Sequence, residues 1–360
     1  MSESQRPVEG AAAVRGEDAF DVEAVTAWLA ANALDPTGIE GVPAVQQFTG
    51  GASNLTYLLS YAARDLILRR PPAGTKAKGA HDMGREFGIQ QALAPVFPLA
   101  PTMVGYCADE SVIGSEFYVM DRLEGLILRR DIPDGVGLDA EADRDRLCRS
   151  AIDALVALHE ADLDRSGLRS LDRGPGYVER QVGGWVGRYG RARTPDVGDF
   201  AATIAWLQAN QPVESPHTMI HNDFRFDNLV LDRADPTRIV GVLDWELATV
   251  GDPILDLGSG LAYWCQADDP EDVQAIRLQP TNAPGMWTRD QVWTAYADAR
   301  GITVSPTERL FAEVFGTFRL AGIAQQIYYR AFHKQTTNPM AQAMGYVVRV
   351  LEAHAQQLLA

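Results

Sequence analysis

The chain has 360 residues and a formal net charge of −16, with 46% hydrophobic and 22% charged residues. This length and composition are typical of a globular protein with one large domain or two lobes. The acidic balance argues against a nucleic-acid substrate, because phosphate contacts require clustered Lys and Arg. It could steer a cationic substrate, or it could only keep the protein soluble.

The sequence has no apolar stretch long enough to cross a membrane and no secretory signal at its start. Cys107, Cys148 and Cys265 are scattered and odd in number, which suits a reduced protein better than a disulfide framework. We therefore expect a cytoplasmic protein with neither a membrane nor a nucleic acid as partner. The sequence does not indicate an oligomeric state.

A small, mostly β lobe is expected over residues 19–124, after a poorly ordered terminus over 1–18. Helical spacing of apolar residues predicts helices over 21–31 and about 83–94. The predicted strands are rich in β-branched and aromatic residues and cover 45–48, 55–61, 66–68, 103–106 and 116–120.

A larger, mainly helical lobe is expected over residues 125–360. Its predicted helices cover 143–160, 176–191, 199–209, 288–300, 306–333 and 340–359. Short strands are expected over 218–220, 229–231 and 239–243. Asp252, followed by Pro253, is expected to cap a further helix, and Asp256 is interpreted as structural.

A polar run between these short strands carries the chemistry. It reads H-x-D-x-x-x-x-N from His221 to Asn228, and a second acid, Asp244, follows 21 positions after Asp223. An Asp, an Asn five residues on and a second Asp after a hairpin can bring three oxygen-bearing groups to one point. Phosphoryl transfer needs one carboxylate to receive the acceptor proton and two oxygen ligands for Mg²⁺. We predict Asp223 as the base, and Asn228 and Asp244 as the metal ligands.

Three neighbouring residues have a chemical and a structural interpretation. His221 is expected to fix the loop through hydrogen bonds to the backbone or to the Asp244 region. Arg225 could stabilise charge on the transferring phosphoryl group, or it could be a solvated loop arginine. Glu246 would point the same way as Asp244 in an extended segment, so it could bind a second Mg²⁺ or instead pair with an arginine.

A glycine-rich turn in the front lobe is a candidate phosphate-binding loop. In Gly50-Gly51-Ala52-Ser53-Asn54 the glycines could let backbone N–H groups approach phosphates, and Ser53 could donate its hydroxyl. The segment is not a Walker A loop, because no Gly-Lys-Ser/Thr follows, and it could equally be an ordinary hairpin turn.

Further nucleotide contacts are expected from the next strands. Arg69 stands where kinases carry a Lys that holds phosphates and pairs with a helix Glu, here Glu86; the alternative is a strand-edge charge pair. An adenine could hydrogen-bond the carbonyl of Asp121 and the amide of Leu123 after the last strand.

These residues resemble the aminoglycoside phosphotransferase and choline kinase-like family over roughly residues 40 to 335. The matching segments are His221-x-Asp223-x4-Asn228, Leu243-Asp244-Trp245-Glu246, Asp252-Pro-x-x-Asp256-Leu, Phe48-Thr-Gly-Gly-Ala-Ser-Asn54, Leu68-Arg69-Arg70-Pro71-Pro72, Arg85-Glu86 and Leu155-x-x-Leu158-His159. The Arg-Arg-Pro-Pro strand end and Arg180-Gln181-x3-Trp185 resemble a branch fused to, or encoded near, acyl-CoA dehydrogenases. Some members of that branch are implicated in phosphorylating hydroxyacyl-CoA compounds.

The resemblance implies an α+β, two-lobed protein-kinase-like fold, with an antiparallel-sheet N-terminal lobe, a larger helical C-terminal lobe, and nucleotide and Mg²⁺ in the cleft between them. It also implies Asp223 as the base and Asn228 and Asp244 as metal ligands. Two positions depart from the family pattern. Asn222 stands where the family commonly has Gly, and Arg69 where most of the superfamily has Lys, although Arg is frequent in this branch.

The sequence thus predicts a small-molecule kinase that uses ATP or GTP and Mg²⁺ to phosphorylate a hydroxyl group. The alternative is a catalytically silent kinase-like module that binds nucleotide. The acceptor is expected within residues 180–215 and 260–335. A cationic aminoglycoside could be attracted by Glu214, Asp268, Asp269 and Asp272. An anionic or CoA-linked acceptor could be received by Arg180, Arg188, Arg191, Arg319, Tyr328, Tyr329 and Arg330.

Overall fold

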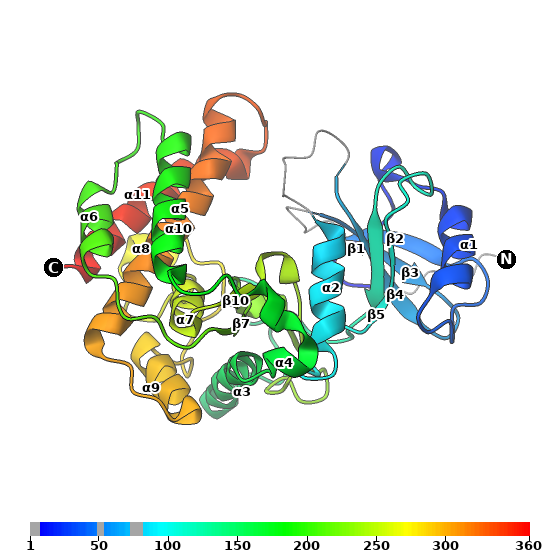
Figure 1. Ribbon diagram of the computed structural model, residues 1–360, viewed down its shortest axis with the longest axis horizontal. Helices are drawn as coiled ribbons and strands as arrows, with labels where there is room; N and C mark the ends of the chain where they lie inside the picture. Colours follow the sequence, from blue (N-terminus) through cyan, green and yellow to red (C-terminus); the bar gives the residue numbers. More distant parts are fainter. Residues whose placement is uncertain (1–7, 49–53, 73–81) are drawn as a thin grey trace. The chain divides into compact units, whose positions relative to one another are not determined.

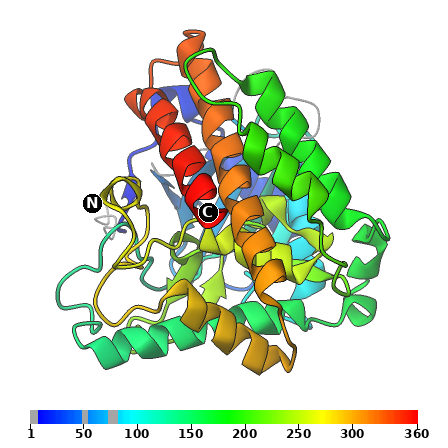
Figure 2. The same cartoon turned by 90° about the vertical axis from the view of Figure 1, so that its left-hand side faces the viewer.

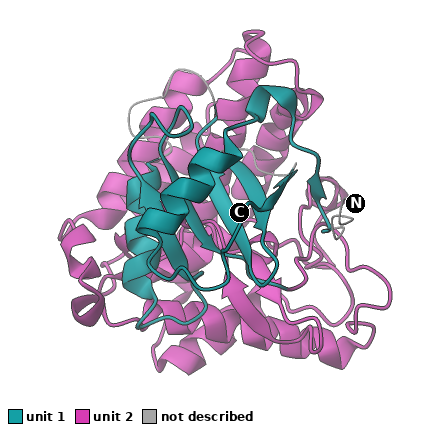
Figure 3. Ribbon diagram, turned by 90° about the vertical axis from the view of Figure 1, so that its right-hand side faces the viewer, with its two compact units in different colours: residues 1–124 teal, residues 125–360 magenta. Residues whose placement is uncertain are grey.

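The computed structural model describes residues 8–48, 54–72 and 82–360 (Figure 1). The chain forms two compact units, Met1–Glu124 and Gly125–Ala360, coloured separately in Figure 3. Unit 1 contains an antiparallel sheet and unit 2 is mainly helical, so the α+β class is confirmed. Each unit is described by itself below.

Unit 1 is built on a six-stranded sheet with the order β1-β2-β3-β4-β6-β5, in which every neighbouring pair is antiparallel. The strands are β1 (Ala11–Ala12), β2 (Ala44–Phe48), β3 (Leu55–Ser60), β4 (Asp65–Arg70), β5 (Met103–Cys107) and β6 (Phe117–Asp121). Two helices accompany them, α1 (Val22–Asn32) and α2 (Met83–Leu93), each begun by an aspartate N-cap, Asp21 and Asp82.

The two faces of this sheet pack against different helices, because alternate residues of a strand point to opposite sides. Tyr57 and Leu59 of β3 face the core formed with Val25 and Leu29 of α1. Leu58, one residue apart from both, belongs to the other core, which includes Met83 of α2. Figure 1 shows α1 and α2 on opposite sides of the strands.

The N-terminal segment differs from the prediction of a poorly ordered terminus through residue 18. Strand β1 pairs with β2, and a short 3-10 helix follows at Gly16–Asp18. The carboxylate of Asp18 accepts hydrogen bonds from Arg15 and from the buried Gln47. These long-range contacts order residues whose own composition has no structural signal.

Unit 2 contains nine helices within the described residues: α3 (Glu141–His159), α4 (Leu163–Ser166), α5 (Tyr177–Ala192), α6 (Ala201–Ala209), α7 (Pro253–Leu261), α8 (Glu271–Ala275), α9 (Arg289–Arg300), α10 (Pro306–Phe332) and α11 (Pro339–Leu358). Two small antiparallel pairs hold the polar run in place. Strand β7 (Thr218–Ile220) pairs with β10 (Thr249–Gly251), and β8 (Leu229–Leu231) pairs with β9 (Ile239–Val242).

Helix α10 is central to unit 2 and packs against α11, α7 and α5. Figure 2 shows α10 in orange beside the red α11. At the crossing with α7, a Cβ on Gly316 would overlap the carbonyl oxygen of Gly258, so glycine permits direct backbone approach of the two helices. No helix in the described part of the chain is both long and apolar enough to cross a membrane.

Candidate active site

His221 fixes the start of the polar loop, as predicted. Its ring is fully buried; Nδ1 accepts the N–H of Asp223 at 3.2 Å, and Nε2 lies 2.9 Å from the carbonyl oxygen of Leu243. Because a backbone N–H can only donate, Nδ1 must be unprotonated and the proton is on Nε2, which donates to Leu243. A neutral histidine therefore ties Asp223 to the segment that leads into Asp244.

Asn222 adopts a conformation that explains why its position suits glycine. Its φ is +64°, in the left-handed region that Gly and Asn tolerate better than other residues. Its side-chain amide donates to the carbonyl of Leu247 at 3.0 Å, and its own carbonyl accepts from Arg319 at 2.7 Å. The departure from the family pattern is thus compatible with a tight loop.

Asp256 of α7 holds the backbone of the same loop through hydrogen bonds. Its carboxylate accepts the N–H of His221 at 2.9 Å and of Asn222 at 2.6 Å, and it lies 3.0 Å from Nε2 of His159. Burial alone would favour a neutral acid, but the His159 contact and the backbone donors outweigh it and lower the pKa of Asp256. The prediction that Asp256 has a structural role agrees with this geometry.

The structure brings Asp223 and Asn228 into direct contact. Oδ2 of Asp223 accepts from Nδ2 of Asn228 at 2.9 Å and from Nε of Arg225 at 3.1 Å. Nδ2 of Asn228 also donates to the carbonyl of Asp223, while the backbone carbonyl of Asn228 accepts from the N–H of Leu243 at 2.8 Å. Asp244 follows Leu243 directly, so the backbone next to Asp244 is hydrogen-bonded to Asn228.

The segment after Asp244 is not extended, which corrects the premise for Glu246. Asp244 has a φ of +66°, and Trp245–Leu247 form a 3-10 helix. With three residues per turn, side chains at positions 244 and 246 do not share a face as they would in a strand. The indole of buried Trp245 donates to the carbonyl of Val242 and packs on the His221 ring, which stabilises this turn. The role of Glu246 as a ligand thus loses its geometric support.

Arg225 lies between two acids. Its guanidinium contacts Asp223 and also Asp227, the latter at 2.9 Å, and stacks over the ring of Tyr263 at 4.8 Å. Burial disfavours the cation, but Asp223, Tyr263 and Asp227 together raise the pKa of Arg225. The interpretation as a solvated loop residue is therefore wrong. Asp227 was missed by sequence reasoning, although it lies inside the motif.

In unit 1, the predicted ion pair between Arg69 and Glu86 is present. Nη1 of Arg69 lies 2.6 Å from the buried carboxylate of Glu86, and the hydroxyl of Tyr118 donates to the same oxygen at 2.7 Å. Gly50, Gly51 and Ser53 lie outside the described residues. Asn54, the last residue of that predicted loop, is buried.

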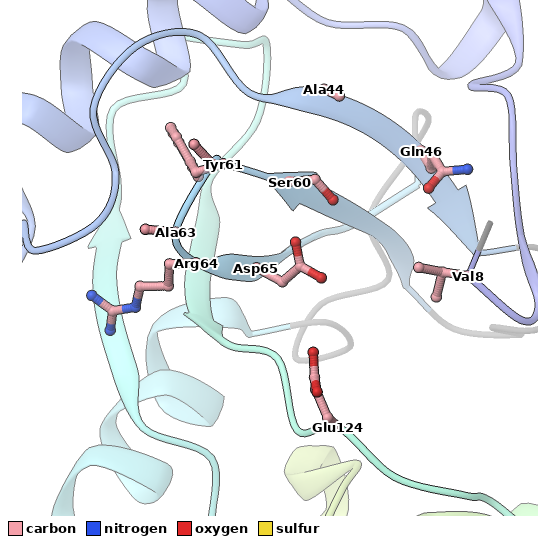
Figure 4. A pocket seen from close by; sticks show the side chains of 10 residues that line it. Val8, Ala44, Gln46, Ser60, Tyr61, Ala63, Arg64, Asp65 and Glu124 are labelled. Atoms are coloured by element: carbon pink, nitrogen blue, oxygen red, sulfur yellow. The ribbon is translucent and has the colours of Figure 1, made fainter. Parts of the chain in front are cut away.

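The same sheet face carries a pocket of about 310 Å³ (Figure 4). Asp65 lines it, and because strand residues alternate, Asp65 and Arg69 of β4 point to one face of the sheet. Figure 4 shows Ser60, Asp65 and Glu124 around this space. Asp121 is the last residue of β6, and its carboxylate is held by Arg64 at 2.7 Å. Leu123 lies between the end of β6 and Glu124, the last residue of unit 1.

In unit 2, two of the four acids predicted to attract a cationic acceptor are used within the fold, whereas Asp268 is exposed. Glu214 accepts the N–H groups of Gly176 and Val178 at the start of α5. Asp269 forms a two-pronged ion pair with Arg289, at 2.6 and 2.8 Å. Arginine side chains instead line a pocket of about 400 Å³ between α5 and α10, whose lining residues are Arg188, Arg191, Ala192, Gln326, Tyr329 and Arg330.

An antiparallel-sheet unit with a strand-to-helix Arg–Glu pair, and a helical unit with an Asp–Asn–Asp loop, define a kinase-like phosphotransferase. The comparison with known families agrees. Residues 44–292 match the phosphotransferase enzyme family, and the chain belongs to this family.

Relatives and solved structures place the chain within that family. It is 34% identical over 301 residues to mouse acyl-CoA dehydrogenase family member 10, and 33% identical over 295 residues to human member 11. The matches cover 83% and 81% of this chain but only 28% and 37% of those proteins. A Ralstonia eutropha JMP134 structure, whose name assigns it to the aminoglycoside phosphotransferases, has a TM-score of 0.79 at 27% identity and covers 94% of this chain and 98% of its own.

Proposed function

We propose that this protein transfers the γ-phosphoryl group of ATP, or GTP, to a hydroxyl group of a small molecule in a Mg²⁺-dependent reaction. The observation that carries the proposal is the direct contact of Asp223 with Asn228, joined through Leu243 to Asp244. A structure of the aminoglycoside phosphotransferase APH(4)-Ia in complex with ADP and hygromycin B shares this fold, with a TM-score of 0.55 at 12% identity, coverage of 88% of this chain and coverage of 94% of that one.

Asp223 is the proposed base. Both side-chain hydrogen bonds described for its carboxylate end on Oδ2, so Oδ1 is the oxygen that would face the acceptor hydroxyl. Arg225 and Asn228 hold the carboxylate in one orientation, as a base must be held to receive a proton. Arg225 is proposed to act mainly through this positioning, because two acids already offset its charge.

Asn228 and Asp244 fit Mg²⁺ by their chemistry. The amide nitrogen of Asn228 faces two acceptor oxygens of Asp223, so its Oδ1 points away from Asp223 and is oriented to serve as a ligand. Within the described residues no three His, Cys, Asp or Glu side chains form a metal cluster. Mg²⁺ commonly uses one or two carboxylates together with substrate phosphates. When bound, the ion would offset the charge of the transferring phosphoryl group.

Unit 1 is proposed to bind the nucleotide. Arg69, oriented by Glu86, would contact phosphates, with Gly50, Gly51, Ser53 and Asn54 as the predicted loop over them. The carbonyl of Asp121 and the amide of Leu123 would hydrogen-bond the base. The pocket lined by Ser60, Asp65 and Glu124 offers acceptor oxygens for the amino and hydroxyl donors of a nucleoside, and Arg122 contacts both carboxylates, at 2.7 Å from Asp65 and 3.8 Å from Glu124.

The test is to compare the wild type with Asp223→Asn, using isotopically labelled ATP and a library of hydroxyl compounds. We expect transfer to fall about 10² to 10⁴-fold, because the proton acceptor is lost while its shape is kept. Calorimetry should show that ATP binding is retained. Unchanged turnover would refute the assignment of the base, and ATP binding without product from any acceptor would favour a silent module.

A further inference from the structure

The pocket between α5 and α10 has the character of an anion site. Three of its lining residues are arginines, Arg188 and Arg191 from α5 and Arg330 from α10. All three are exposed to solvent. Its volume of about 400 Å³ lies in the range of small-molecule sites.

Within the described residues, none of these three arginines forms an ion pair with a carboxylate. By contrast Arg225, Arg277 and Arg289 each contact an aspartate. The pKa of Arg188 is lowered by partial burial and by the charges of Arg191 and Arg319. Helix α5 contains only one acid, Glu179. Positive charge is thus gathered without its counter-charge, in a chain with a net charge of −16.

The backbone beneath these arginines is unusually open. Glycines lie four residues before two of them, and a Cβ on Gly184 or Gly187 would lie 3.4 or 3.2 Å from Nη1 of Arg188 or Arg191, respectively. Gly183 and Gly190 would meet nothing within 4 Å. Glycine weakens a helix interior relative to alanine, and packing does not require it at these last two positions. Gly184 and Gly187 thus let these two guanidinium groups lie close to the helix backbone.

A single aromatic ring connects this pocket to the loop of Asp223. The guanidinium of Arg188 lies 4.6 Å and that of Arg319 5.3 Å from the ring of Trp185. Arg319, only 4% exposed, donates to the carbonyl of Asn222 at 2.7 Å. An anion held by Arg188 would therefore lie in the same unit as the proposed base, and the ring of Trp185 contacts both Arg188 and the arginine that supports the loop of that base.

We propose that Arg188, Arg191 and Arg330 bind a phosphate group other than the one transferred. Guanidinium groups suit phosphate because they offer paired donors in one plane. The phosphate could belong to the acceptor itself or to a separate phosphorylated effector. The alternative in which the phosphate belongs to the acceptor rests on the proposed function, whereas the phosphate-binding site itself does not.

The first experiment measures binding of inorganic pyrophosphate to the full chain by calorimetry, in the presence of saturating ATP so that the nucleotide site is filled. We expect binding to the wild type and a loss of about tenfold or more in Arg188→Gln/Arg191→Gln, and separately in Arg330→Gln. The matched control is Arg180→Gln, on the same helix, whose guanidinium donates to the carbonyls of Gly174 and Pro175. Thermal melts verify that each variant is folded.

Two results would overturn the site: no pyrophosphate binding to the wild type at millimolar concentration, or equal binding to the wild type and to both arginine variants. If the wild type binds ATP but yields no product from any acceptor while pyrophosphate binding depends on these arginines, the proposed function fails and the site stands. A second experiment assigns the source of the phosphate. For a phosphate on the acceptor, the double variant should raise KM about tenfold for a phosphorylated alcohol and leave KM unchanged for its dephosphorylated counterpart. For an effector, pyrophosphate should instead alter turnover of the dephosphorylated alcohol.

Discussion

Asp227 is a partly buried acid whose carboxylate forms an ion pair with Arg225. Its Oδ2 lies 2.9 Å from Nη1 of Arg225, and within the described residues its buried Oδ1 has no hydrogen-bond partner. Burial raises the pKa of Asp227, and Arg225 offsets part of that effect. Arg225 thus serves two acids at once, since Asp223 accepts from the same guanidinium. Removal of the cation should affect folding as well as the base.

We expect Arg225→Gln to lower the free energy of unfolding by about 2 to 4 kcal/mol at pH 8, because Asp227 then lies buried as an uncompensated charge. The folded-state pKa of Asp227 is already raised, and loss of Arg225 raises it further. In the folded variant Asp227 therefore holds its proton more tightly than it does in the unfolded chain. The free energy of unfolding should then fall as pH rises above the ordinary pKa of an aspartate. Chemical denaturation should show a smaller loss at pH 5 than at pH 8.

The matched control is Arg225→Gln/Asp227→Asn, which removes the acid together with its partner. It should recover most of the lost stability at pH 8 and show little difference between the two pH values. A double variant as unstable as Arg225→Gln would mean that the stacking of Arg225 on Tyr263, rather than the charge of Asp227, dominates.

At the scale of elements, a buried series of hydrogen bonds joins α9, α3 and α7 to the loop that holds Asp223. Tyr296 contacts Nδ1 of His159 at 2.7 Å, and Nε2 of His159 contacts Asp256, which holds the backbone of His221 and Asn222. Burial lowers the pKa of His159, although Asp256 acts in the opposite sense. His159 is therefore neutral in the folded protein and donates to an ionised Asp256.

The hydrogen bonds of His159 predict that the stability of the protein depends on pH. Unfolded His159 takes up a proton as pH falls through its ordinary range, while the folded form resists it, so the wild type loses stability from pH 7 to pH 5. His159→Gln keeps a donor for Asp256 but cannot titrate. Its difference from the wild type in unfolding free energy should be larger at pH 7 than at pH 5, as measured by urea denaturation. His333→Gln, at the exposed end of α10, is the control; a constant difference for His159→Gln would contradict this account.

The longer elements could be predicted from local patterns. Helical spacing of apolar residues predicted α1, α2 and α10 to within one or two residues of their ends, and α10 begins with a capping box formed by Ser305 and Glu308. Strand β1 could not be predicted, because two alanines owe their conformation to pairing with β2. The 3-10 turn at Trp245–Leu247 also had no local signal, since its stability comes from the burial of Trp245 against His221.

The contacts of the candidate site also fall into those that local sequence patterns could predict and those that they could not. The spacing within one loop predicted that Asp223 and Asn228 would meet, and the contact of Arg69 with Glu86 followed from strand and helix positions. Contacts between distant segments were not predictable. The use of Glu214 as a cap for α5 spans 38 positions, and the pocket shared by Arg188 and Arg330 exists only because α5 packs on α10.

At the scale of the whole molecule, the net charge is negative, whereas the proposed anion pocket between α5 and α10 is lined by positive charge. The chain carries −16 overall, which could attract cations over long distances. The pocket between α5 and α10 is nevertheless lined by three arginines, and Glu214 and Asp269 are held by the backbone and by Arg289. Short-range interactions are less screened than long-range ones at physiological salt, so the local charge should decide which acceptor binds.

Classical aminoglycosides should therefore be poor acceptors for this enzyme. Kanamycin is a polycation, and the arginines of the α5–α10 pocket would repel it, while Glu214 and Asp269, two of the four acids predicted to attract it, are held within the fold. We expect ATP turnover with millimolar kanamycin to match the rate without acceptor, with Asp223→Asn as the background. Phosphorylation of kanamycin with kcat/KM of about 10⁴ M⁻¹s⁻¹ or more, an ordinary enzymatic efficiency, would show that a cation site forms elsewhere in unit 2.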